Sequence, residues 1–254
     1  DESYVKFVED RIVDAAIKAH QNLAPAVIGL AVADATGVGT NRRDPNGPKD
    51  LQVPLLVVRE NAKGAKPIAA MLVCSMHPTV LHEDSTLISG DFPHFTRQFL
   101  HQAILPESCP IVYHNGASGN QSPRLVTSAN TFAEAERLGR KLGAAIGKVI
   151  PEIRYRREAA VRSRCRLLDL QVRSFGTATE ADQRAGRARA KLDRLRKEGV
   201  SRPEIRAAEC DWFGAEETVE LTRAAMDGRL EIAARACLPA EIQWIGIGPW
   251  NFIG

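Results

Sequence analysis

The sequence predicts an α/β fold: a mixed sheet flanked by helices, with a long helical excursion at about 179–235. Strand-like and helix-like segments alternate through the first 150 residues, which is typical of α/β layers. The 254 residues, 44% of them hydrophobic, can bury a substantial core, and a net charge of only +3 argues against disorder. Apolar runs such as Ile68–Cys74 are far shorter than the roughly 18 residues of a membrane-spanning helix. We expect one domain over 1–254.

The N-terminal part of the chain predicts one helix and three strands. Residues 4–21 have helical periodicity, and residues 25–32 form a strand-like run. The apolar segments 53–59 and 68–76 flank the turn Asn61–Gly64, which favours a hairpin. The apolar side of the expected helix consists of Tyr4, Val8, Ile12, Ala15 and Ala19.

The middle of the chain predicts two helices around a further strand. A helix begins at Asp91, a good capping residue, and continues to Leu105. Residues 109–113 form an apolar strand. The helix at 131–149 begins with Thr131 and Glu134, the spacing of a capping box.

The C-terminal part predicts a strand at 160–172, helices at about 179–198 and 203–235, and a last strand at 241–247. Residues 151–206 carry 16 Lys and Arg against 8 Asp and Glu, a net charge of +8. We interpret these charges as the solvated side of an amphipathic helix rather than as a nucleic-acid site, because an apolar stripe accompanies them. The stripe consists of Ala181, Ala185, Ala188, Leu192 and Leu195.

The residues that could carry chemistry lie in three loops that follow or join predicted strands, where α/β proteins place their sites. His77 ends a buried strand, is followed by Pro78, and could be a metal ligand, an acid–base group or a structural residue. His82, five residues later, could reach the same metal. Residues 39–48 are rich in turn formers, and Arg42 there could bind a carboxylate or a carbonyl, or could be an ordinary surface arginine.

The third loop, 114–124, consists mainly of small residues. Its backbone amides could approach an anion or a developing oxyanion, or its glycines could serve a tight turn at positive φ. The segment begins like the nucleophile elbow Gly-x-Ser-x-Gly around Ser118, but Asn120 stands where the last glycine would be.

Four segments, taken in order, resemble one family. They are Asn41-Arg42, His77-Pro78-Thr79, Ser89-Gly90-Asp91-Phe92-Pro93 and Gly119-Asn120-Gln121-Ser122-Pro123. Together they are similar to the neutral/alkaline, non-lysosomal ceramidases, in which the last segment reads Gly-Asp-x-Ser-Pro. The resemblance covers about 39–124, and the helix at 131–149 fits the next element of that family.

The resemblance implies a zinc-dependent amidohydrolase that cleaves the N-acyl amide bond of ceramide, or of a related N-acyl lipid, through a zinc-activated water. It implies that His77 is a zinc ligand, that Arg42 contacts the polar head or amide oxygen of the substrate, and that Ser122 is the active-site serine, as a nucleophile or a positioning hydroxyl. Further residues implied to bind substrate or to support the site are Asn41, Asp91, Gly119 and Asn120.

In the family that the sequence resembles, two His, a Glu and a Tyr hold the zinc ion. The family's His-x-His-Ser and Pro-Gly-Glu segments do not occur in these 254 residues. We therefore expect an incomplete part of a larger catalytic domain, inactive alone, with the other Zn²⁺ ligands outside it. We expect a small-molecule or lipid substrate, no nucleic acid, and at most peripheral contact with a membrane. The resemblance implies a secreted or periplasmic location.

Two other functions stay open. The chain could be a non-catalytic α/β domain that binds a small polar ligand or a partner at 116–124. It could also be a metal-independent serine hydrolase that uses Ser118 or Ser122 with His77 or His114. A fluorophosphonate probe and a chelator separate the serine and zinc mechanisms.

Overall fold

The computed structural model describes residues 2–82, 85–171 and 173–253, which form two compact units, 1–158 and 159–254. The prediction of a single domain over 1–254, as part of a larger catalytic domain, stays a prediction.

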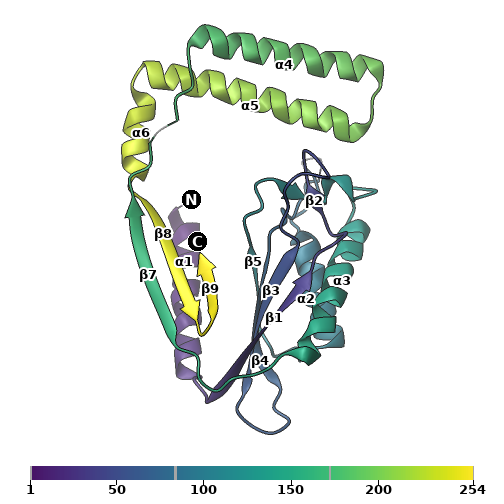
Figure 1. The fold of residues 1–254 in the computed structure, drawn as a ribbon, viewed down its shortest axis with the longest axis vertical. Coiled ribbons are helices and arrows are strands. Elements are labelled where there is room, and N and C mark those ends of the chain that lie inside the picture. Colours follow the sequence, from purple (N-terminus) through teal and green to yellow (C-terminus); the bar gives the residue numbers. More distant parts are fainter. Residues whose placement is uncertain (1, 83–84, 172, 254) are drawn as a thin grey trace. The chain divides into compact units, whose positions relative to one another are not determined.

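The first unit is built on a four-stranded mixed sheet in the order β1-β3-β4-β5 (Figure 1). These strands are β1 (Ala26–Asp34), β3 (Gln52–Glu60), β4 (Pro67–Cys74) and β5 (Ile111–Asn115). β3 pairs antiparallel with β1 and β4, whereas β5 pairs parallel with β4. The predicted α/β class, mixed sheet and hairpin are confirmed. Because Cys74 is the register partner of Asn115, the loops after β4 and β5 leave the same edge of the sheet.

Two helices, α2 (Asp91–Ala103) and α3 (Phe132–Val149), pack together on one side of this sheet (Figure 1). Glycine allows their close approach: a Cβ at Gly139 would lie 2.5 Å from Phe95 Cβ and 2.7 Å from the Phe92 carbonyl oxygen. The core between helices and sheet contains, among others, Val53, Leu55, Val57, Leu72, Phe92, Leu100, Leu138, Leu142 and Ile146. This burial supplies the main stabilisation of the unit.

The predicted capping box of α3 forms only in part. Thr131 Oγ1 accepts a hydrogen bond from the Glu134 amide at 3.2 Å, as expected. The Glu134 carboxylate does not return to Thr131; it accepts from the Ser128 amide at 2.8 Å and binds Arg137. α2 ends at Ala103 rather than Leu105, and Asp91 is its first residue rather than its cap, which is Gly90.

A second, minimal sheet joins two of the loops that carry candidate residues. β2 (Thr40–Asn41) pairs antiparallel with β6 (Gln121–Ser122), so that Thr40 faces Ser122 and Asn41 faces Gln121. The short 3₁₀ helix η1 (Pro123–Leu125) follows at once, with a second one, η2 (Ile150–Glu152), after α3. The pairing fixes residues 40–41 against 121–122.

The N-terminal helix α1 (Glu2–Gln21) forms where periodicity predicts it, but none of its residues is buried. The side chains of its expected apolar side, such as Tyr4 and Ile12, are exposed. None of the described helices is long and apolar enough to cross a membrane.

The described residues of the second unit form a three-stranded antiparallel sheet and three helices; Figure 1 shows their arrangement. The strands are β7 (Val161–Leu168), β8 (Ala240–Ile247) and β9 (Trp250–Ile253), and the helices are α4 (Ala178–Glu198), α5 (Arg202–Met226) and α6 (Arg229–Cys237). The helical excursion is confirmed. The single helix expected at 203–235 is wrong, because Gly228, at φ 79°, separates α5 from α6. β9 was not predicted.

The basic helix α4 is an ordinary packed amphipathic helix. Ala181 and Leu192 of the predicted stripe are buried in its packing with α5. Arg196 pairs with Glu209 of α5, and Arg189 lies over the Trp212 ring with its guanidinium carbon 4.4 Å from the centroid. This arrangement agrees with the predicted amphipathic helix, whose apolar stripe packs and whose basic side is solvated.

Candidate functional site

Three loops that are distant in sequence meet at one edge of the four-stranded sheet. The Arg42 amide donates to the Asn120 carbonyl at 2.8 Å, next to the β2–β6 pair. The His77 amide donates to the Gln121 carbonyl at 3.0 Å. The backbone therefore brings together Asn41-Arg42, His77 and Gly119–Ser122, three of the four segments that carry the family resemblance.

The His77 imidazole has a defined orientation. Its Nδ1 lies 2.8 Å from the Ser118 carbonyl oxygen. Because a carbonyl can only accept, we assign the proton to Nδ1, which leaves the lone pair of the neutral ring on Nε2. Metal-binding histidines commonly hold their second nitrogen in this way. His77 is half-buried, so the ring is held yet not sealed from solvent.

Asn41 and Asn120 hold the 42–48 turn. The side-chain nitrogens of Asn41 and Asn120 both donate to the Pro48 carbonyl, at 2.9 and 2.7 Å. Asn41 Oδ1 accepts from the amides of Arg43 and Asp44. A carboxylate at 120 could not donate to Pro48, which gives a local reason for asparagine where the ceramidase pattern has aspartate.

Arg42 is positioned by its backbone, and its side chain is available. The residue is half-buried, and its guanidinium forms no hydrogen bond or ion pair with the part of the chain that the structure describes. A guanidinium held on a fixed turn without a protein partner can bind an anion or a carbonyl oxygen.

Asp91 connects the His77 loop to the helix layer. Its buried carboxylate accepts from the amides of Val80 and Leu81, at 2.9 and 3.0 Å, and from the Phe92 amide at 2.7 Å. Asp91 has φ 50°, a left-handed conformation that is uncommon outside glycine. These three bonds hold it there, and through residues 80–81 they fix the end of the loop that begins at His77.

Among the residues that the structure describes, neither candidate serine hydroxyl is paired with a histidine. Ser118 and Ser122 are both buried. Ser118 Oγ lies 2.9 Å from the Asn115 side-chain amide, and Ser122 Oγ accepts from the Arg124 amide at 3.3 Å as the cap of η1. His77 faces the Ser118 carbonyl rather than its hydroxyl. This is not the nucleophile–base contact of a serine hydrolase.

Of the two alternatives for the 114–124 loop, the one with glycines at positive φ is not met. Neither Gly116 nor Gly119 has positive φ. Gly116 is required by close approach instead, because a Cβ there would lie 2.5 Å from Ser75 Oγ. A Cβ at Gly119 would meet nothing within 4 Å.

Cys74 lies buried beneath this edge beside the Tyr113 hydroxyl. Burial raises the pKa of the Cys74 thiol to about 11, so the thiol stays protonated near neutral pH. Burial likewise raises the pKa of Tyr113. Cys74 is therefore a packed hydrophobe, as its sequence context indicates, and not a nucleophile.

Within residues 2–82, 85–171 and 173–253, no three His, Cys, Asp or Glu side chains gather as a metal site. His82, the second candidate ligand, has its Nδ1 3.0 Å from Asn130 Nδ2. His77 therefore fits one ligand position, because it is only half-buried and its Nε2 has no hydrogen-bond partner among the described residues. The described residues do not supply a complete metal-binding set.

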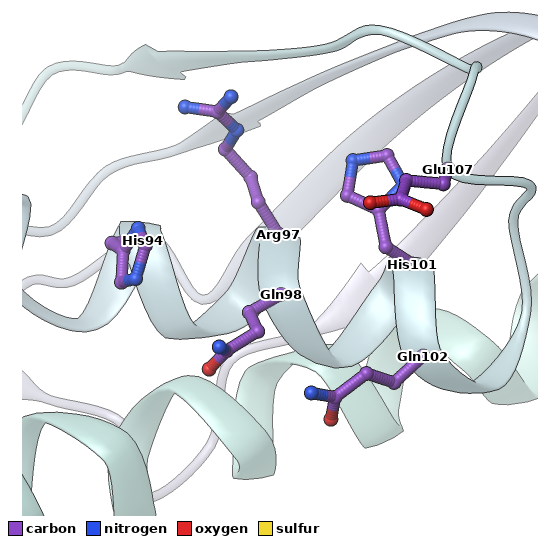
Figure 2. A pocket seen from close by; sticks show the side chains of 6 residues that line it. All are labelled: His94, Arg97, Gln98, His101, Gln102 and Glu107. Carbon is purple, nitrogen blue, oxygen red and sulfur yellow. The ribbon is translucent and has the colours of Figure 1, made fainter.

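An open depression of about 480 Å³ lies elsewhere, on the outer side of α2. It is lined by His94, Arg97, Gln98, His101, Gln102 and Glu107. Figure 2 shows that Arg97 and His101 point away from Gln98 and Gln102, so the polar groups do not converge on one point. The depression contains none of the predicted site residues.

Gln121 is the residue of this edge that sequence reasoning missed. It is 2% exposed and binds both the Asp50 amide and the Ala117 carbonyl through its side chain. It occupies the variable position of Gly-Asp-x-Ser-Pro, and no local pattern marks it.

Comparison with known proteins supports the fold. No protein-family model matches the sequence, and no curated protein matches it. A neutral ceramidase structure from Pseudomonas aeruginosa matches 63% of this chain with a TM-score of 0.51 and 18% identity. A structure described as ceramidase complexed with C2 matches 59% of the chain with a TM-score of 0.49 and 16% identity. The chain spans 28% and 26% of those two chains, respectively. The resemblance inferred from the four segments is thus confirmed as a likeness of fold.

Proposed function

We propose that this chain forms part of the catalytic domain of a neutral-ceramidase-type hydrolase, which cleaves the N-acyl amide bond of ceramide or of a related N-acyl lipid. One observation carries the proposal: the His77 ring, the Asn41-Arg42 turn and the Gly119–Ser122 segment converge at one sheet edge. They do so in a fold that resembles part of neutral ceramidase.

We propose Zn²⁺ as the cofactor, with His77 as one ligand and the remaining ligands outside the described residues. Zinc, when bound, supplies a Lewis acid that polarises an amide carbonyl and makes water more acidic. The support from this chain is the Ser118 carbonyl, which orients the His77 ring and, in the neutral ring, leaves the lone pair on Nε2. Imidazole nitrogen is a normal zinc ligand.

Arg42 is the substrate-binding residue in this proposal. Its guanidinium has no described protein partner, and the Asn120 carbonyl holds its backbone beside the β2–β6 pair. An arginine there would bind the amide oxygen or a head-group hydroxyl of the lipid through its planar N–H donors.

Ser122, Asp91, Asn41, Gly119 and Asn120 take supporting roles. Ser122 is buried and caps η1, which favours a positioning hydroxyl over a nucleophile. Asp91 holds the amides of residues 80–81, and the two asparagines hold the Pro48 carbonyl. Gly119 is exposed and leaves open space at the loop, where a substrate chain could pass.

The test is hydrolysis of a fluorescent N-acyl-sphingosine by the complete gene product. We expect release of the labelled fatty acid, and Arg42→Ala should lower kcat/KM by about 10- to 100-fold, the worth of a charge-assisted hydrogen bond. The matched control is Arg97→Ala, on the outer side of α2. Absence of hydrolysis for ceramides and related N-acyl lipids would contradict the proposal.

The serine-hydrolase alternative makes the opposite prediction for two reagents. It requires labelling of Ser118 or Ser122 by a fluorophosphonate and activity that survives a chelator. The contacts of both hydroxyls argue against it.

A further inference from the structure

We propose that Gln121 is the positioning residue for the His77 imidazole; the inference deepens the proposed function and rests on it for the role of His77. Gln121 contacts no substrate or metal in this account. It acts by fixing the carbonyl group that orients the ring.

The backbone of Gln121 forms a closed ring of hydrogen bonds with His77. The Ser118 carbonyl accepts from two donors, the Gln121 amide at 2.8 Å and His77 Nδ1 at 2.8 Å. The Gln121 carbonyl in turn accepts from the His77 amide at 3.0 Å. Hydrogen bonds therefore hold the main chain of His77 to Gln121 and its imidazole to Ser118.

The side chain of Gln121 stabilises this ring of hydrogen bonds through two further contacts. Its Oε1 accepts from the Asp50 amide at 2.7 Å, and its Nε2 lies 3.4 Å from the Ala117 carbonyl. The first contact ties the loop to the start of β3, and Asp50 also accepts from Ser75 Oγ at 3.2 Å. The second contact fixes the peptide next to the Ser118 carbonyl.

Only an amide satisfies both contacts, because the Asp50 amide needs an acceptor and the Ala117 carbonyl needs a donor. A side chain at 121 that cannot make one of these contacts leaves the Asp50 amide or the Ala117 carbonyl without that hydrogen bond. Gln121→Glu keeps the acceptor and loses the donor, whereas Gln121→Met keeps the shape and loses both. Gln121→Met should therefore disturb the His77 ring more than Gln121→Glu does.

The experiment measures the tautomer of His77 directly in the 254-residue chain. Long-range ¹H–¹⁵N correlation spectra of the imidazoles, at about pH 8 where histidine is neutral, distinguish Nδ1–H from Nε2–H rings. We expect His77 in the wild type to carry its proton on Nδ1. We expect the Nδ1–H to Nε2–H ratio to fall about fivefold in Gln121→Met, which corresponds to one hydrogen bond. The matched control Gln98→Met, on the exposed side of α2, should leave the ratio unchanged.

Backbone amide spectra confirm that each variant is folded, and Gln121→Glu replaces Gln121→Met if the latter does not fold. A folded Gln121 variant with the wild-type His77 tautomer would overturn the inference. The measurement uses neither zinc nor substrate, so it separates the two proposals. A tautomer shift without N-acyl lipid hydrolysis by the complete gene product contradicts only the proposed function. Hydrolysis that needs His77 but tolerates both variants contradicts only the role of Gln121.

Discussion

His77 Nδ1 and the Ser118 carbonyl oxygen lie 2.8 Å apart, and this contact determines what the ring can do. A carbonyl partner keeps the proton on Nδ1 and leaves Nε2 as the free base, the state in which imidazole binds a metal. The same contact uses the backbone of Ser118, so it does not activate the Ser118 hydroxyl. One distance thus favours the metal mechanism over the serine mechanism.

Asp91 should be among the most sensitive polar residues of the first unit. Asp91→Ala removes the acceptor of three backbone amides and retains an unfavourable φ of 50°, so we expect a loss of about 3 kcal/mol in unfolding free energy. Asp91→Gly loses the same bonds but accepts this φ, and should be about 1 kcal/mol more stable than Asp91→Ala. Urea unfolding measures both. Equal stability of the two variants would show that backbone conformation is not a factor.

The two glycines of the 114–124 loop should respond differently to alanine. Gly116→Ala places a Cβ 2.5 Å from Ser75 Oγ and should cost about 1–3 kcal/mol. Gly119→Ala enters open space and should stay within about 0.5 kcal/mol of the wild type. Thermal melting of the pair provides the comparison. A neutral Gly116→Ala would mean that the loop can move away from Ser75 without penalty.

Asn120 should not tolerate the aspartate of the ceramidase pattern without loss. Asn120→Asp replaces the donor that lies 2.7 Å from the Pro48 carbonyl with an acceptor. We expect a decrease of about 1 kcal/mol in unfolding free energy, which lowers Tm by about 2–4 °C for a chain of this size. An unchanged or raised Tm would remove this explanation for asparagine at 120.

Glu134 should make stability depend on acid pH. The Arg137 guanidinium, which donates to both carboxylate oxygens, lowers the pKa of Glu134 from 4.5 to about 2 in the folded chain. Its stabilising contribution is therefore fully present above about pH 4.5 and is lost as the pH falls toward about 2. Glu134→Gln should flatten this part of the curve of unfolding free energy against pH. Glu136→Gln, which removes the exposed pair with Arg140, should leave the curve unchanged.

The sequence predicted the parts of the fold that local patterns specify. The hairpin of β3 and β4 follows from two apolar runs around Asn61–Gly64, and α4 follows from its apolar stripe. The helix expected at 203–235 includes Gly228, whose positive φ divides that helix into α5 and α6. The Thr131–Glu134 spacing fits a capping box, yet it cannot reveal that Arg137 and the Ser128 amide compete for the same carboxylate.

The candidate site was predicted residue by residue but not as an assembly. His77 and Arg42 were singled out from their loops, and the family resemblance implied roles for them and for Ser122. Their convergence depends on the bond from the His77 amide to the Gln121 carbonyl and on the β2–β6 pair. Each of those strands has two residues, too few to produce a periodic signal. The role of Gln121 arises only from that pairing and from its contacts with Asp50 and Ala117. Asp50 is distant from Gln121 in sequence, and Ala117 lies in the same loop.

In the proposed function His77 acts through a bound metal, and the effect of a chelator on hydrolysis tests this role. The rate of N-acyl-sphingosine hydrolysis is measured for the complete gene product and its His77→Ala variant, before and after treatment with a chelator, with His94→Ala as the exposed-histidine control. We expect chelation to abolish wild-type hydrolysis and added Zn²⁺ to restore it, and we expect His77→Ala to lose at least about 100-fold in rate. Wild-type rates in His77→Ala, or hydrolysis that continues in the chelator, would contradict the claim.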